Sequence, residues 1–248
     1  MFGRAALTIA TPLGAAIGLA TAFALREAAP WRPDDFGSGW MHVAWAAALI
    51  GGTVAALLSH RWSWLPRLAA VALAAYVTVP MERRDGPWWF VALAAAIALP
   101  WLAVPANESE TKRQWPERLV LLAFALGALS VVALHAHFLR ATDFAMMTAC
   151  ALAGGAVASA LLARDGCELD GLGYVTLPAL ALCTWNDTES AIPTAAFACA
   201  GLAAVPIAAF RWLPRAGWRA LLIRGAMVLI PAAIAAILAM SFEEVSFG

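Results

Sequence analysis

The stretch RLVLLAFALGALSVVALHAHFL, residues 118–139, decides the fold class. Between Arg118 and His135 it carries no ionisable side chain, and as a helix it is long enough to cross the roughly 30 Å hydrocarbon core of a bilayer. Since the bilayer core offers no water to the backbone, such a segment must satisfy its own N–H and C=O groups, as an α-helix does. The stretch therefore predicts a transmembrane helix.

Similar apolar segments recur along the chain, separated by charged or Pro/Gly-rich breaks. Of the 248 residues, 63% are hydrophobic and only 13% are charged, against about 25% charged in soluble domains. We therefore predict an all-α, polytopic transmembrane helical bundle with about nine spanning helices. The predicted spans are residues 5–25, 41–58, 65–81, 88–104, 118–139, 144–163, 169–185, 191–210 and 219–240.

The first span has an alternative interpretation. Arg4, the apolar run after it and the small residues Ala20 and Ala22 resemble a secretory signal peptide. The internal repeat described below favours a retained helix instead.

The distribution of Lys and Arg predicts the orientation, because cytoplasmic loops carry an excess of these residues. With alternating spans, 11 of the 16 basic residues fall on the side of the N-terminus. We therefore expect a multi-pass protein of the cell inner membrane with a cytoplasmic N-terminus and, after an odd number of spans, a C-terminus outside. The residues on the N-terminal side are Arg4, Arg61, Arg67, Lys112, Arg113, Arg118, Arg164, Arg211, Arg215, Arg219 and Arg224.

Four landmarks recur in the same order in two parts of the chain. They are FALREAAPWRPDDF and HFLRATDF, GGTVAALLSHR from Gly51 and GGAVASALLAR from Gly154, YVTVP from Tyr76 and YVTLP from Tyr174, and ALPWLAV and AVPIAAF. We interpret them as a parallel internal repeat of four helices, because an even number of spans keeps both copies in one orientation. Coincidence in an Ala-rich chain is the alternative.

This repeat divides the chain into three parts. Residues 1–110 hold the first copy with spans one to four, and residues 111–217 hold the second copy with spans five to eight. Residues 218–248 hold the ninth span and an outer C-terminal tail.

Small residues and prolines within the spans predict how the helices pack. Small residues four apart let helix backbones approach closely in a membrane. Pro12, Pro178, Pro206 and Pro231 lie inside apolar stretches, where each removes a backbone donor and can kink the helix. The glycines predicted to pack helices are Gly14, Gly18, Gly51, Gly52, Gly154 and Gly155.

The predicted outer face holds the densest polar chemistry. A metal or an acid–base reaction could use side chains shared between loops, although ordinary interfacial polar residues have the same composition. His135 and His137 are two residues apart, which on one helix turns them away from each other. The candidate outer-face cluster consists of His42, His135, His137, Asp143, Asp187 and Glu189.

Arg83 and Arg84 form a basic pair on the side that is otherwise poor in basic residues. They are candidates for contact with an anion or a lipid headgroup. Pairing with the neighbouring acids Glu82 and Asp85 is the alternative.

The remaining patterns exclude several function classes. The chain contains no GxxxxGK[ST], HExxH, GxSxG or CxxCH motif, so we predict no cofactor and no metal. The formal net charge of +0 gives no field that would recruit nucleic acid. The predicted partners are the lipid bilayer and, as open alternatives, a membrane-protein partner or a second copy of the chain.

Three function hypotheses follow. The first is a small permease-like or flippase-like transporter of an apolar or amphipathic molecule, based on the parallel repeat, the prolines and the lack of charge at mid-span. The second is a non-catalytic membrane scaffold or accessory subunit of a larger complex. The third, a membrane-embedded enzyme acting at the outer face, has the weakest support, and its catalytic residues are unknown.

Overall fold

The computed structural model describes residues 13–19, 21, 39–58, 62–79, 86–103, 115–162, 169–187, 190–213 and 217–243. Every regular element within these residues is a helix, as predicted. Residues 13–19 are helical and fall in the predicted first span. The further elements are α2 (Gly39–Leu57), α3 (Trp64–Thr78), α4 (Pro87–Ala103), α5 (Trp115–His135), α6 (Leu139–Leu162), α7 (Asp170–Asp187), α8 (Thr194–Gly201), the 3-10 helix η3 (Val205–Trp212) and α9 (Trp218–Glu243).

Four of these helices are long and apolar enough to cross a membrane. They comprise residues Trp40–Leu57, Pro116–His135, Leu139–Ala160 and Trp218–Phe242. Shorter apolar helices cover Trp64–Thr78, Pro87–Ala103 and Thr194–Phe210. The total of about nine crossings therefore stays a prediction.

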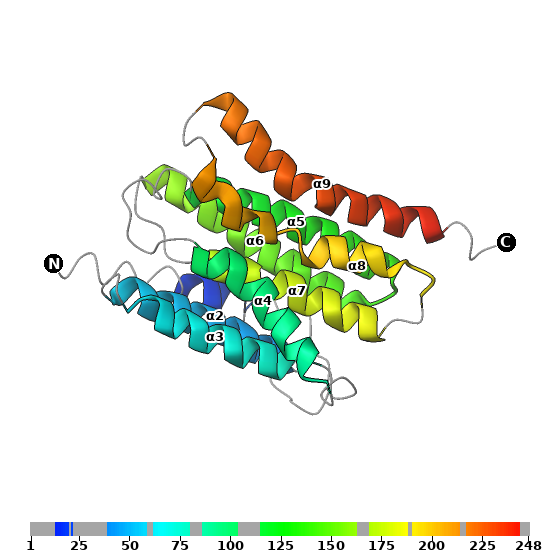
Figure 1. The fold of residues 1–248 in the computed structure, drawn as a ribbon, viewed down its shortest axis with the longest axis horizontal. Helices are drawn as coiled ribbons and strands as arrows, with labels where there is room; N and C mark the ends of the chain where they lie inside the picture. The colour runs from blue at the N-terminus through cyan, green and yellow to red at the C-terminus, as the bar shows by residue number, and fades with distance from the viewer. Residues whose placement is uncertain are drawn as a thin grey trace.

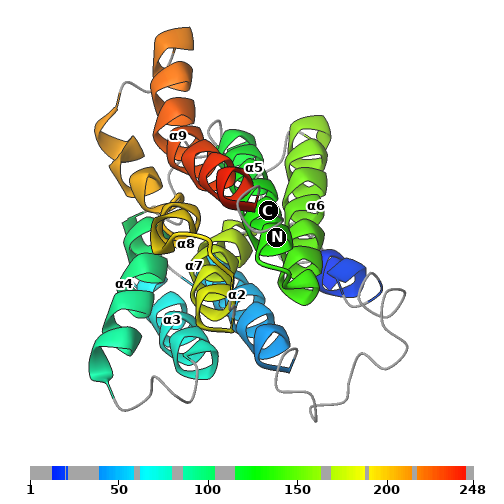
Figure 2. The ribbon, with the colours of Figure 1, turned by 90° about the vertical axis from the view of Figure 1, so that its right-hand side faces the viewer.

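Helix α7 is the centre of the bundle (Figures 1 and 2). It contacts α2, α3, α4, α5, α6 and α8. Of its 18 residues, 14 are buried, from Asp170 at its start to Thr184 near its end. A helix that is apolar on all its sides is typical of such a central position.

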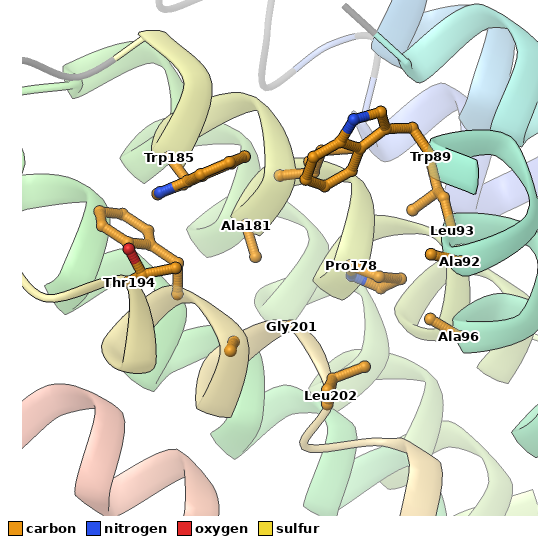
Figure 3. A pocket seen from close by; sticks show the side chains of 13 residues that line it. Trp89, Ala92, Leu93, Ala96, Pro178, Ala181, Trp185, Thr194, Gly201 and Leu202 are labelled. Carbon is orange, nitrogen blue, oxygen red and sulfur yellow. The ribbon is translucent and has the colours of Figure 1, made fainter. Parts of the chain in front are cut away.

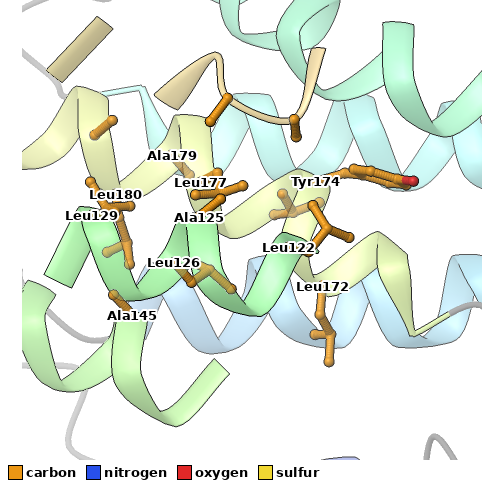
Figure 4. Close-up of a cluster of buried hydrophobic side chains, with 14 of the residues drawn as sticks. Leu122, Ala125, Leu126, Leu129, Ala145, Leu172, Tyr174, Leu177, Ala179 and Leu180 are labelled. Carbon is orange, nitrogen blue, oxygen red and sulfur yellow. The ribbon is translucent and has the colours of Figure 1, made fainter. Parts of the chain in front are cut away.

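The core between α5 and α7 consists mainly of leucines (Figure 4). Leu122, Leu126 and Leu129 of α5 are fully buried, as are Leu177 and Leu180 of α7. Lipid tails are as apolar as leucine, so in a membrane this core is stabilised by close packing more than by removal from water.

Two buried polar contacts fix α7 against the helices from the N-terminal part of the chain. The Trp45 indole N–H of α2 donates a hydrogen bond of 3.1 Å to Thr176 Oγ1. The Cys183 thiol lies 3.4 Å from the carbonyl oxygen of Thr78 at the end of α3. Such contacts fix the position of helices whose apolar surfaces would otherwise allow sliding.

The way in which α5 ends explains the positive φ angle of His137. Its φ of 58° lies in the left-handed region, which few residues other than glycine adopt. The N–H of Phe138 donates to Ala133 O at 2.9 Å and the N–H of His137 donates to Leu134 O at 3.0 Å. These two bonds form a Schellman motif, so His137 ends α5 and starts the turn into α6.

The predicted eighth span is broken into α8 and η3. Helix α8 ends at Gly201, and Leu202, Ala203 and Ala204 form a turn before the 3-10 helix begins at Val205. Pro206 stands in the first turn of η3, where it has no N–H to continue an α-helical pattern. The break therefore lies where the sequence placed a proline inside an apolar run.

Candidate functional site

Three buried charged side chains gather at one end of the bundle. Arg67 lies in the first turn of α3, Arg118 in the first turn of α5, and Asp170 is the first residue of α7. Their exposed fractions are 3%, 2% and 2%. Since charged groups are rarely buried in the interior of a membrane protein without a role, this polar cluster is a candidate functional site.

The charges of the polar cluster are arranged around Asp170. Arg118 Nη1 lies 3.7 Å from Asp170 Oδ2. Arg67 is close enough to act electrostatically on the same carboxylate, and its Nη1 donates a hydrogen bond of 3.2 Å to the carbonyl oxygen of Trp101 in the last turn of α4. The cluster thus joins four helices through one carboxylate and two guanidinium groups.

Trp101 and Tyr174 complete the polar cluster. The Trp101 ring packs against Gly171 so closely that a Cβ at that glycine would lie 2.6 Å from the ring. Tyr174 is fully buried one turn after Asp170, and its hydroxyl, which points away from the leucine core in Figure 4, interacts with Asp170 and Arg118. Within the described part of the chain, the Tyr174 hydroxyl, Trp101 Nε1 and Asp170 Oδ1 make no hydrogen bond of standard geometry.

A second ion pair lies between α5 and α9. Arg224 Nε and Nη2 donate to the two carboxylate oxygens of Glu117 at 2.7 and 3.0 Å. The guanidinium also lies 5.9 Å from the ring centroid of Phe210 in η3. The Arg224 side chain is 4% exposed and pairs inside the bundle.

A separate, apolar pocket lies toward the other end of α7 (Figure 3). It has a volume of about 210 Å³ and is formed by α4, α7 and α8. Apart from the Thr194 hydroxyl and two indole groups, its lining carries no polar side chain. The lining residues are Trp89, Ala92, Leu93, Ala96, Pro178, Ala181, Leu182, Trp185, Thr194, Phe197, Ala198, Gly201 and Leu202.

Trp89 and Trp185 face each other at one side of the pocket (Figure 3). Their ring centroids are 5.4 Å apart and the rings are tilted by 35°. Pro178 on α7 and Gly201 at the end of α8 line the pocket between them. The pocket therefore has aromatic rings at one side and several small side chains along its length. This shape suits an elongated apolar group.

The polar cluster and the pocket share helices α4 and α7. At a rise of about 1.5 Å per residue, Asp170 lies about 12 Å along α7 from Pro178 and about 22 Å from Trp185. On α4, Trp101 belongs to the cluster and Trp89 to the pocket. One helix pair thus carries a charged end and an apolar end.

The described outer-face candidates do not form a metal-binding group. His42 packs edge-on against Trp45 and Phe144, with ring centroids 5.7 and 5.8 Å away. Asp187 accepts a hydrogen bond from its neighbour Asn186. No group of three or more His, Cys, Asp or Glu residues that could hold a metal occurs in the part of the chain that the structure describes.

Three further outer-face candidates lie at or near the turn between α5 and α6. His135 is the last residue of α5 and is half-buried, as is Asp143 near the start of α6. His137 is exposed in the turn between these helices. Glu189 and the basic pair Arg83 and Arg84 lie outside the described residues.

The predicted packing glycines fall into two groups. A Cβ at Gly51 would lie 2.6 Å from Ala70 of α3, and a Cβ at Gly155 would lie 2.7 Å from Leu169, so both stand at close contacts. Gly52 is buried in α2. Around Gly14, Gly18 and Gly154 no such atom lies within 4 Å.

Sequence reasoning missed the polar cluster as a site. It used Arg67 and Arg118 only to orient the chain and did not single out Asp170 or Trp101. One signal was present: Asp170 is an acid just inside a predicted span, four residues before the Tyr174 of the YVTLP landmark. Charges at the starts of separate spans do not reveal which helix ends meet.

Comparisons with known proteins give no further guidance. No protein-family model, no curated protein and no solved structure matches the chain. The geometry of the polar cluster and of the pocket is therefore the basis for a proposed function.

Proposed function

We propose that the chain is a permease-like or flippase-like protein of the inner membrane that carries an amphipathic molecule with an apolar tail. The observation that carries this proposal is the apolar pocket between α4 on one side and α7 and α8 on the other. Helix α4 belongs to the first predicted repeat, and α7 and α8 belong to the second. Transporters built from repeats bind their substrates at such an interface.

The size and lining of the pocket favour a hydrocarbon chain. Its volume of about 210 Å³ exceeds the roughly 150 Å³ of an engineered cavity that binds benzene. It is smaller than the roughly 300 Å³ at which pockets for drug-sized ligands begin. A lining of alanine, leucine and aromatic side chains has almost no partner for a polar group, so a segment of an apolar tail fits it best.

Breaks in the surrounding helices give the pocket a means of changing shape. Pro178 lies inside α7 and lines the pocket, and α8 ends at Gly201, which also lines it. Prolines and discontinuous helices are where membrane helices bend. Movement of η3 and the end of α8 relative to α4 would open the pocket along its length.

The orientation, the span count and the repeat belong to the same proposal. We infer about nine crossings, a cytoplasmic N-terminus and an outer C-terminus, which puts the polar cluster at the cytoplasmic end and the pocket toward the outer end. Alkaline phosphatase fused after Gly248 is expected to be active, because that enzyme needs an oxidising compartment. An inactive but intact fusion, with an active cytoplasmic reporter at the same position, would reverse the orientation.

The transport proposal is tested with the purified chain in proteoliposomes. The rate at which a fluorescent phospholipid crosses between leaflets should exceed that of protein-free liposomes. Ala92→Phe fills the pocket and should reduce the rate to the protein-free value. Ala95→Phe is the matched control, because Ala95 is exposed on the same helix and does not line the pocket. Equal rates for both variants and the wild type would contradict the proposal.

A scaffold function is the second candidate, and the surface of α9 favours it. Ile223, Ile230 and Ile237 are spaced by seven residues along α9, with exposed fractions of 45%, 56% and 57%. Such a stripe suits a partner helix as well as lipid. A purified chain that is well folded yet moves no lipid, and that forms a defined oligomer lost on Ile230→Ser, would favour the scaffold.

A further inference from the structure

The polar cluster contains buried hydrogen-bonding atoms that make no hydrogen bond of standard geometry, although the Tyr174 hydroxyl interacts with Asp170 and Arg118. In the described residues these are Tyr174 Oη, Trp101 Nε1 and Asp170 Oδ1. All three side chains are at least 98% buried. Buried polar groups normally make well-formed hydrogen bonds, so several incompletely bonded groups in one place indicate a bound molecule or water.

The surroundings of these atoms favour a negative charge. Arg67 and Arg118 both act on the carboxylate of Asp170. In addition, α3, α5 and α7 all begin at this end of the bundle, and the N-terminus of a helix carries partial positive charge. Among the described residues of the polar cluster, two guanidinium groups and the starts of three helices therefore lie near the Asp170 carboxylate.

We propose that the polar cluster binds the phosphate group of a phosphate monoester. The phosphate oxygens accept hydrogen bonds from the Tyr174 hydroxyl, Trp101 Nε1 and Arg118. A monoester, with a second pKa of about 6, retains a proton part of the time and can donate it in a hydrogen bond to Asp170 Oδ1. A phosphodiester has no such proton, which makes the monoester the better match.

Which molecule carries this phosphate group is inferred from the proposed function. A monoester lipid that enters from the cytoplasmic leaflet would place its headgroup at the polar cluster. Its tail would then run along α4 and α7 toward the apolar pocket, which begins about 12 Å further along α7. Free inorganic phosphate has the same headgroup chemistry without a tail.

The test measures binding to the full-length purified chain in detergent micelles. The probes are phosphatidic acid, phosphatidylcholine and inorganic phosphate, and binding is followed by native mass spectrometry. The variant Tyr174→Phe removes one hydroxyl that makes no standard hydrogen bond, so folding should persist. Thr184→Val is the matched control, because it removes another buried, unmatched hydroxyl of α7 near the opposite end of the helix.

We expect phosphatidic acid to bind at least tenfold more tightly than phosphatidylcholine. Tyr174→Phe should weaken binding of phosphatidic acid about tenfold, the usual effect of losing a hydrogen bond to a charged group. Thr184→Val should leave binding unchanged. Inorganic phosphate that binds as tightly as phosphatidic acid would support the phosphate site and overturn the lipid as its source.

Two results would overturn the phosphate site itself. One is equal affinity for phosphatidic acid and phosphatidylcholine, and the other is equal weakening by Tyr174→Phe and Thr184→Val. Neither result affects the proteoliposome assay when its fluorescent phospholipid is a phosphatidylcholine, so failure of the phosphate site is separate from failure of the transport proposal.

Discussion

Arg224 of α9 donates two hydrogen bonds, of 2.7 and 3.0 Å, to the carboxylate of Glu117 of α5. The two residues are 107 positions apart in the sequence. Helix α9 exposes large apolar side chains along much of its length, and this ion pair and the contact of Arg224 with Phe210 fix its position against α5 and η3. A paired buried charge specifies position even where it adds little net stability.

Removal of one partner of this ion pair should destabilise the bundle. Glu117→Ala leaves the guanidinium of Arg224 buried without its carboxylate, and we expect a loss of about 3 kcal/mol in the free energy of unfolding. The value lies at the lower end of the usual range because the Glu117 side chain is 15% exposed. Unfolding in detergent with increasing denaturant measures the loss.

The double variant Glu117→Ala with Arg224→Leu provides the control for this prediction. It also removes the Arg224 guanidinium that Glu117→Ala leaves without its carboxylate, so the double variant should recover more than half of the lost stability. A double variant that is less stable than Glu117→Ala alone would show that the ion pair is not the cause.

His137 should tolerate glycine and reject a β-branched residue. Its φ of 58° suits glycine, which has no Cβ, and is costly for valine. We expect His137→Gly to stabilise the protein by up to about 1 kcal/mol and His137→Val to destabilise it by about 1 kcal/mol. Thermal unfolding in detergent distinguishes the two variants.

The same pair of variants tests a chemical role for this histidine. If His137 acted at the outer face as an acid, a base or a metal ligand, His137→Gly would abolish activity in spite of greater stability. We expect lipid movement to be unchanged in this variant.

Two helical glycines should respond in opposite ways to alanine. A Cβ at Gly171 would lie 2.6 Å from the Trp101 ring, whereas no atom lies within 4 Å of a Cβ at Gly154. Gly171→Ala should therefore cost about 1–3 kcal/mol of stability through overpacking. Gly154→Ala should add about 0.5–1 kcal/mol by reducing the freedom of the unfolded backbone. Similar effects of both variants would contradict the packing of Trp101 against α7.

The positions of most helices could be predicted from the sequence because bilayer-length apolar runs have few alternatives. The predicted segment 118–139 corresponds to α5, Trp115–His135, and the segment 219–240 corresponds to α9, Trp218–Glu243. The break within segment 191–210 could be predicted only in part from the sequence. Pro206 indicated a kink, but the change to a 3-10 helix depends on the turn at Leu202–Ala204.

The environment of a motif could not be predicted from its letters. Tyr76 and Tyr174 open the similar stretches YVTVP and YVTLP. Tyr76 is 59% exposed and stacks on Phe90, whereas Tyr174 is fully buried beside Asp170. The difference arises because α7 has neighbours on all sides and α3 lies at the edge of the bundle, a property of tertiary packing.

The candidate sites were hidden for the same reason. The sequence drew attention to the densest polar residues, such as His135, Asp143 and Asp187, which lie near span ends and form no metal-binding group in the described residues. The pocket is lined mainly by alanine and leucine, which have no chemical signature in a sequence. Only the meeting of α4, α7 and α8 forms a pocket from them.

Occupancy of the pocket by a lipid tail is the central claim, and site-resolved photo-crosslinking tests it most directly. The purified chain is reconstituted with phosphatidic acid that carries a diazirine in its acyl chain, and adducts are mapped by mass spectrometry. The account predicts adducts concentrated at residues 89–96, 178–185 and 194–202, reduced by unlabelled lipid and by Ala92→Phe but not by Ala95→Phe. Adducts confined to the exposed face of α9, and insensitive to both variants, would contradict it.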